Sequence, residues 1–219
     1  MIDHTATRIS EHKESEDSKS FPNRKQEIWR YVNTSTIGSF SQLPTASKQS
    51  SSQDHSNIGI TVSHFSGNQF YGDLPDDIMA SFTETSQPIS TKDHIADKNY
   101  LFTAGNTPTL TIKKNSVSEH TLCINPDFES INWNRLHINA EQGSECELNI
   151  EYFGENQTHE SSTEISINIE KGAILKISFL NISNDKSLVL QGVDATLNRD
   201  ARLEILDLDS NIKATRSRY

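Results

Sequence analysis

The residues best suited to bind a metal ion or to act as nucleophiles are two cysteines and eight histidines. A metal site needs thiolate, imidazole or carboxylate ligands that converge on one point. The sequence has no C-x-x-C or H-x-x-x-H pair, and these residues are scattered along the chain. We therefore predict no metal-binding residue and no bound cofactor. The residues are Cys123, Cys146, His4, His12, His55, His64, His94, His120, His137 and His159.

The chain also lacks the motifs that usually carry catalysis. Serine is abundant, but there is no G-x-S-x-G elbow, no Walker A loop and no G-x-G-x-x-G loop. The adjacent carboxylates Asp76 and Asp77 fall where a short helix is expected to begin, and the helix dipole explains them. We expect Cys146 to be a small buried thiol, Cys123 to be able to face solvent, and His137 to point outward. The sequence thus predicts a protein that is not an enzyme, with no catalytic and no cofactor-binding residue.

An internal repeat organises the second half of the chain, between Leu136 and Leu208. Its three rungs read LHINAEQGSECELNIEYF, TEISINIEKGAILKISF and QGVDATLNRDARLEIL, and they align with offsets of 27 and 28 residues. Each rung has two short alternating strands joined by a tight connector. Repeats of this length are typical of stacked units that bury their apolar faces against one another. The alignment matches Ile138 with Ile165 and Val193, Cys146 with Ala173 and Ala201, Leu148 with Leu175 and Leu203, and Ile150 with Ile177 and Ile205.

Alternation within the second strand of each rung separates a dry face from a wet face. The dry positions are mostly apolar, whereas the positions between them suit water. When equivalent strands stack in one register, the result is a β-solenoid, in which each strand pairs with its equivalent one rung away. An antiparallel β-sandwich would also alternate, but nothing would hold it to a repeat of 27–28 residues, so we favour the solenoid. The wet positions are Glu147, Asn149, Lys176, Ser178, Arg202 and Glu204.

Composition divides the chain into three parts. Residues 1–20 are charged and polar, which predicts a mobile arm. Residues 21–105 predict a small α/β segment that contains a Ser-rich linker at 41–57. Residues 106–219 predict the rungs of the β-helix. The fold class is therefore mainly β, with the solenoid preceded by the α/β segment.

Local signals within these parts predict further elements. We expect a hairpin over residues 58–72, because a Gly-Asn turn separates two apolar runs. Short helices are expected over 74–82, where apolar residues are spaced by four, and over 91–104. The first and least regular rung begins at Thr109. A rung aligned with that of Gln191 would begin at position 219, so we expect the last rung to expose an unpaired strand edge.

Charge and cysteine content restrict the partners and the compartment. The chain of 219 residues has a formal net charge of −10 and no basic stripe, which argues against nucleic-acid binding. No run approaches the roughly 18 apolar residues of a membrane-spanning helix, and the N-terminal residues lack the apolar region of a signal peptide. Two cysteines provide no disulfide framework. We predict a soluble, cytoplasmic protein that binds neither nucleic acid nor membranes.

The stretch FPNRKQEIWRY, residues 21–31, resembles the SufB/SufD family of iron–sulfur cluster assembly proteins, and SufD in particular. Members of this family carry a Leu/Phe-Pro-x-Arg-Lys-x-Glu-x-Trp-Lys/Arg-Tyr stretch near the N-terminus. The order that follows is also similar: a variable linker, a small α/β segment and then β-helix rungs. The resemblance covers about residues 20–215, which correspond to about the first half of a usual family member. The matching residues are Phe21, Pro22, Arg24, Lys25, Glu27, Trp29, Arg30 and Tyr31.

The resemblance implies a right-handed parallel β-helix that acts as a scaffold. In the family, the scaffold works in a SufB–SufC–SufD complex, the SufBCD complex of the SUF system. SufC is its ATPase, and clusters are built at the SufB–SufD interface. The later rungs and the C-terminal helical region, which carry the SufC docking site and the cluster residues, have no counterpart in this sequence. From the resemblance we expect SufB and SufC as partners. Because those regions have no counterpart, we transfer no catalytic or metal-binding position.

Two other functions agree with the repeat. A solenoid with an uncapped end can recognise a protein partner by strand addition, and the same end is a place where two copies of the chain can associate. Solenoid enzymes that act on polysaccharides line a cleft with outward carboxylates and basic residues, and aromatic rows stack on the sugars. The wet positions here are mixed and contain no aromatic row, so this third function is the least favoured.

Overall fold

A computed structural model describes residues 62–66, 69–83, 107–124, 131–153, 160–182, 186–210 and 214–219, together with Ile95, Asn99 and Thr103. The predicted polar arm at 1–20, the Ser-rich linker at 41–57 and the Trp29 segment lie outside these residues. In the described ranges the protein is mainly β. No helix of this part of the chain has the length and apolar character needed to cross a membrane.

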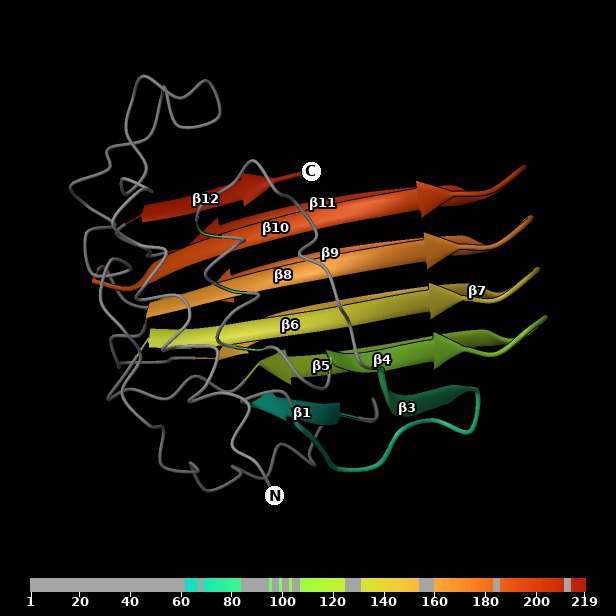
Figure 1. The fold of residues 1–219 in the computed structure, drawn as a ribbon, viewed down its shortest axis with the longest axis horizontal. Coiled ribbons are helices and arrows are strands. Elements are labelled where there is room, and N and C mark those ends of the chain that lie inside the picture. Colours follow the sequence, from blue (N-terminus) through green and yellow to red (C-terminus); the bar gives the residue numbers. More distant parts are fainter. Residues whose placement is uncertain are drawn as a thin grey trace, which may run out of the picture.

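The described strands form two sheets, which lie one behind the other in Figure 1. Sheet A contains β1 (Val62–Ser66), β2 (Gln69–Tyr71), β5 (Val117–Ile124), β7 (Glu145–Phe153), β9 (Ile174–Ile182) and β11 (Arg202–Ser210). Sheet B contains β3 (Ile78–Thr83), β4 (Thr107–Ile112), β6 (Ile131–Ala140), β8 (Glu160–Ile169), β10 (Leu188–Leu197) and β12 (Ala214–Arg218).

From β4 onward the chain alternates between the two sheets, so each strand neighbours the strand two positions away. The order is β11-β9-β7-β5-β1-β2 in sheet A and β12-β10-β8-β6-β4-β3 in sheet B. Pairs from β4 and β5 onward are all parallel. The rows are stacked from the β1 and β3 end to the β11 and β12 end (Figure 1). This order fits a β-solenoid and rules out the antiparallel sandwich for the repeat region.

Antiparallel strands close both sheets at the other end. β1 pairs with β2, which confirms the predicted hairpin. β3 pairs antiparallel with β4, so the helix predicted over 74–82 is wrong. Asp76 and Asp77 lie in the turn before β3 rather than at a helix start. The described residues of the second predicted helix, Ile95, Asn99 and Thr103, are helical.

The error over 74–82 has a physical cause. Leu74, Ile78 and Phe82 are spaced by four, and four residues are also two full periods of a strand. The pattern therefore could not separate helix from strand. Tertiary pairing decided the outcome: Ile78 lies opposite Ile112, and the Lys113 N–H donates to the Asp77 carbonyl at 2.9 Å.

The observed register corrects the first predicted offset. Leu136 lies opposite Ile165, 29 positions later, and Leu148 lies opposite Ile177 at the same offset. The second offset of 28 is confirmed, because Ile165 lies opposite Val193. A slip of two residues leaves every side chain on its own face of the sheet. Alternation alone therefore could not distinguish an offset of 27 from one of 29.

The tight turns carry the signal that fixes the register. Each turn has one residue in the left-handed region: Gly143 and Gly172, with φ of 70° and 69°, and Asn115 and Asp200, with φ of 56° and 62°. Successive members lie 28, 29 and 28 positions apart, which matches the strand register. Glycine tolerates this conformation freely, and asparagine and aspartate tolerate it better than other residues. The turns therefore stack in one column.

Replacing Gly172 by alanine should lower the free energy of unfolding by about 1–2 kcal/mol, because an L side chain is strained at this positive φ. No heavy atom lies within 4 Å of the position that the new Cβ would take, so the loss reports backbone strain alone. Gly172→Asn should cost less, because Asn115 holds the same conformation in an equivalent turn. Urea denaturation measures both variants, and equal losses would contradict the explanation.

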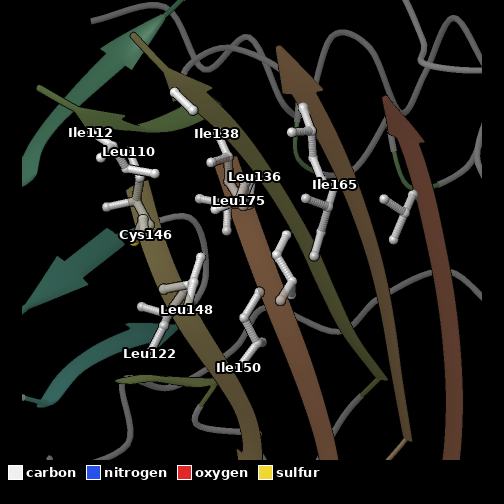
Figure 2. Close-up of a cluster of buried hydrophobic side chains, with 14 of the residues drawn as sticks. Leu110, Ile112, Leu122, Leu136, Ile138, Cys146, Leu148, Ile150, Ile165 and Leu175 are labelled. Atoms are coloured by element: carbon white, nitrogen blue, oxygen red, sulfur yellow. The ribbon is translucent and has the colours of Figure 1, made fainter. Parts of the chain in front are cut away.

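The core lies between the two sheets, and it includes the dry faces predicted for the second strands of the rungs (Figure 2). Sheet A contributes Cys146, Leu148 and Ile150 from β7, and these side chains are at most 2% exposed. Sheet B contributes the facing column from β4, β6 and β8. The side chains labelled in Figure 2 are Leu110, Ile112, Leu122, Leu136, Ile138, Cys146, Leu148, Ile150, Ile165 and Leu175.

The last row differs from the prediction. Residues after Leu208 extend β11 to Ser210 and then form β12, which pairs in parallel with the first half of β10. Gln191 lies opposite Ser217, an offset of 26, whereas the repeat predicted position 219. The next row therefore begins two residues earlier than expected. β12 covers Leu188–Gly192 and leaves the second half of β10 without a partner on this side among the described residues.

Candidate protein-binding edge

The two thiols lie on opposite faces of sheet A. Cys146 is buried in the core, as predicted, but its neighbour in β9 is Leu175 and not Ala173. Cys123 lies on the other face, yet it is only 2% exposed, with its Sγ 4.0 Å from Glu151 Oε2. Burial and the Glu151 carboxylate raise the pKa of the Cys123 thiol to about 12. Burial also raises the pKa of Cys146.

Both thiols should therefore be inert in the folded protein. A thiolate is the reactive form, and a raised pKa keeps these groups protonated at pH 8. We expect Ellman's reagent to detect neither thiol in the native protein and both in 6 M guanidinium. Because the folded-state pKa of Cys123 lies above its ordinary value of 9.0, its contribution to stability is complete below pH 9 and declines as the pH rises toward 12. Rapid native labelling at pH 8 would contradict this prediction.

The structure describes the side-chain surroundings of two histidines, and these two side chains lie in different parts of the molecule. His120 lies in the interior on β5, beside Leu148 of β7. His137 lies on the outer face of sheet B, as predicted, with its Nδ1 2.7 Å from Ser166 Oγ. Burial is the main cause that lowers the pKa of His137. Across the described ranges, no three His, Cys, Asp or Glu side chains gather closely enough to hold a metal ion.

The contact between His137 and Ser166 has the atoms of a nucleophile and base pair. Its setting does not favour that chemistry. Both residues sit in the parallel ladder of β6 and β8, where backbone N–H groups are committed to neighbouring strands. Stabilising an oxyanion requires donors aimed at the reacting oxygen. We interpret the contact as a hydrogen bond that joins successive rows.

The open edge of β11 is the feature of the described surface best suited to bind another molecule. β11 pairs with β9 on one side and with no described strand on the other. Its inward residues Leu203 and Ile205 are only partly buried, although Leu175 and Ile177 one row earlier are at most 1% exposed. An unpaired strand edge offers a row of N–H and C=O groups to an incoming strand.

Apolar side chains extend this edge onto neighbouring surfaces. On the outer face of β11, Leu206 and Leu208 are about half exposed, at 52% and 48%. At the end of β10, Leu197 faces the interior column below Ile169, yet it is 47% exposed. Sequence reasoning missed this patch. The signal was present, because apolar residues move to the outward positions after Ile205 in the stretch LEILDLDS.

The other half of the same end is closed by polar side chains. The Tyr152 hydroxyl donates to Gln191 Oε1 at 3.1 Å, and Gln191 Nε2 donates to the Tyr219 hydroxyl at 3.4 Å. The Tyr219 hydroxyl donates to Asp207 Oδ2, which also accepts from Ser217 Oγ at 2.6 Å. Burial, followed by the bond to Asp207, raises the pKa of Tyr219 to about 12. This chain of hydrogen bonds links the row of β12 to the interior of the earlier rows.

The end of the solenoid therefore has two halves. β12 closes the polar half, whereas β11 and the second half of β10 form the open apolar half. Charges along the open strand are mixed, with Arg202 and Glu204 both exposed. One row earlier, Lys176 Nζ lies 2.6 Å from Glu147 Oε1 on the same face. Such a surface can bind a polypeptide through main-chain hydrogen bonds and apolar contacts.

Comparisons of the chain with protein-family models, with curated proteins and with solved structures give no match.

Proposed function

We propose that the protein is a SufD-like scaffold component of iron–sulfur cluster assembly in the SUF system. The observation that carries the proposal is the FPNRKQEIWRY stretch at residues 21–31, which resembles the corresponding stretch of SufD. The two parallel sheets support it, since the resemblance implies a parallel β-helix. A right-handed coil and a cytoplasmic location belong to the same proposal.

In this function the chain is a scaffold and not a catalyst. Its partners are SufB and SufC, and the nascent cluster is the cargo of the complex. No residue of this chain is assigned to the cluster. The chain contributes a stable stack of strands whose exposed surfaces can contact the other subunits.

Co-expression of the tagged chain with SufB and SufC from the same organism tests this function. Recovery of SufB or SufC with the chain, together with iron and sulfide above the level of a tag-only control, would support the assembly role. The matched variant carries Trp29→Ala in the motif. Its folding is checked before its recovery of SufB and SufC is compared with that of the wild type. Recovery of the wild-type chain alone, without SufB, SufC, iron or sulfide, would contradict the proposal.

A second function is favoured by the open edge of β11. The chain would then be a binding module that adds a strand of a protein partner to its uncapped end. The partly buried Leu203 and Ile205 and the half-exposed Leu206 support it. Leu203→Pro removes one backbone N–H and places a ring at the edge, so it should abolish binding at this end. Association that survives this substitution in a folded variant would exclude the edge as the binding site.

A further inference from the structure

The interior of the solenoid changes from apolar to polar along each strand of sheet B. Leu136 and Ile138 of β6 point into the apolar core (Figure 2). Asn134 is the preceding inward residue of the same strand, and it is only 2% exposed. In register, Asn134 lies opposite Thr163 of β8, and Thr163 lies opposite Gln191 of β10. An inward column of polar side chains therefore runs from row to row beside the apolar core.

Sheet A contributes polar side chains to the same level of the interior. Tyr152 of β7 and Asn181 of β9 are adjacent in register, and both are at most 2% exposed. The Tyr152 hydroxyl lies beside Thr163 and donates to Gln191 Oε1 at 3.1 Å, so side chains of the two sheets meet here. We call these buried residues the polar layer: Asn134, Ser161, Thr163 and Gln191 of sheet B, and Tyr152 and Asn181 of sheet A.

Four polar atoms of this layer have no hydrogen-bond partner within the described part of the chain. They are Asn134 Nδ2, Ser161 Oγ, Thr163 Oγ1 and Asn181 Oδ1, and each of these side chains is at most 2% exposed. A buried polar atom without a hydrogen bond is costly, and native proteins satisfy nearly all such atoms. Four of them in one layer therefore indicate partners that the polypeptide does not supply.

We propose that the polar layer binds internal water molecules in the rows of β6 and β8. Water suits this mixture of atoms because it both donates and accepts: Asn134 Nδ2 only donates, Asn181 Oδ1 only accepts, and hydroxyls do both. A buried water molecule typically makes about three hydrogen bonds to such atoms. An ion would need charged partners to offset its burial, and all six residues of the layer are uncharged.

The place of these rows in the stack makes the inference specific. β6 and β8 each pair with a strand on both sides, so the site does not depend on either end of the solenoid. In the row of β10, Gln191 has protein partners of its own, because it bonds to the hydroxyls of Tyr152 and Tyr219. We therefore expect water at Asn134, Ser161 and Thr163 and none at Gln191. The inference is independent of both proposed functions.

Thr163→Val in the 219-residue chain tests the proposal, because it exchanges a hydroxyl for a methyl group of similar size. If water binds Oγ1, the variant loses hydrogen bonds and should have a lower midpoint of urea denaturation. If the hydroxyl has no partner, the variant loses a destabilising atom and should have a higher midpoint. Val193→Thr is the matched control. It places a hydroxyl at an inward apolar position of β10, where we expect a lower midpoint and no new bound water.

A direct count of bound water completes the experiment. Relaxation dispersion of ¹⁷O in water detects molecules that stay in a folded protein longer than its rotation time. Compared with the wild type, the folded variant Asn134→Leu/Thr163→Val should lose at least one long-lived water molecule, whereas Val193→Thr should keep the wild-type number. This loss, together with a lower midpoint for Thr163→Val, would support the proposal. A higher midpoint for Thr163→Val, or an unchanged count in the double variant, would overturn it.

Discussion

Replacing Leu175 with alanine should lower the free energy of unfolding by about 2–5 kcal/mol, the range for removing a large aliphatic side chain from a packed core. Leu175 is fully buried between the two sheets (Figure 2). It lies in a column with Cys146 of the preceding row and Leu203 of the following row. Each row packs on its neighbours, so a cavity at Leu175 weakens three rows at once. Urea denaturation followed by circular dichroism gives the size of the loss.

The adjacent residue provides the control. Lys176 points to the opposite face, where its Nζ contacts Glu147 in an exposed pair. Lys176→Ala removes a comparable number of atoms from the same strand, but it opens no cavity and breaks a contact that water already screens. Its unfolding midpoint should stay close to that of the wild type. Equal midpoint losses for Leu175→Ala and Lys176→Ala would show that the assigned faces of β9 are wrong.

The faces of the repeat strands were predictable because burial follows a period of two. Cys146, Leu148 and Ile150 all point into the core as the alternation predicted. Register was harder, since a shift by two residues keeps the same faces. Gly143 and Gly172 contained the missing information, because their spacing of 29 equals the observed offset. Turn residues with unusual backbone angles are thus a better guide to register than small side chains within strands.

Elements whose form depends on distant pairing were not predictable. β3 has a spacing that suits a helix equally well, and only its pairing with β4 makes it a strand. β12 begins after a connection that shortens the offset to 26, since Leu188 lies opposite Ala214. Nothing in the repeat indicates this change. Loop length, which varies between rows, sets where each new strand begins.

The open edge was predicted from the point at which the aligned rungs run out, and within the described residues β11 does pair on one side only. Its division into a polar and an apolar half was not predicted. That division depends on β12 covering only part of β10 and on Tyr219 reaching Asp207. Both are contacts between positions whose spacing follows no repeat.

Tyr152→Phe should lower the free energy of unfolding by about 1–3 kcal/mol, the cost of leaving a buried polar atom without its hydrogen bond. Tyr152 and Gln191 are each 2% exposed, and the tyrosine hydroxyl donates to Gln191 Oε1 at 3.1 Å. Phenylalanine keeps the ring and its packing but removes the donor. Water has little access to the amide oxygen of Gln191, so it cannot replace the lost hydrogen bond. Chemical denaturation measures it, with Tyr219→Phe as the exposed comparison.

A double-mutant cycle separates the hydrogen bond from the packing of the ring. Gln191→Leu removes the acceptor with little change in shape, but it also removes the hydrogen bond from Gln191 Nε2 to the Tyr219 hydroxyl, so it should cost at least as much as Tyr152→Phe. When both partners are replaced, no buried polar atom of this pair is left without a hydrogen-bond partner, so the double variant should be about as stable as Gln191→Leu alone. Losses that simply add would mean that Tyr152 and Gln191 act independently, and the polar half of the solenoid end would then not be a connected network.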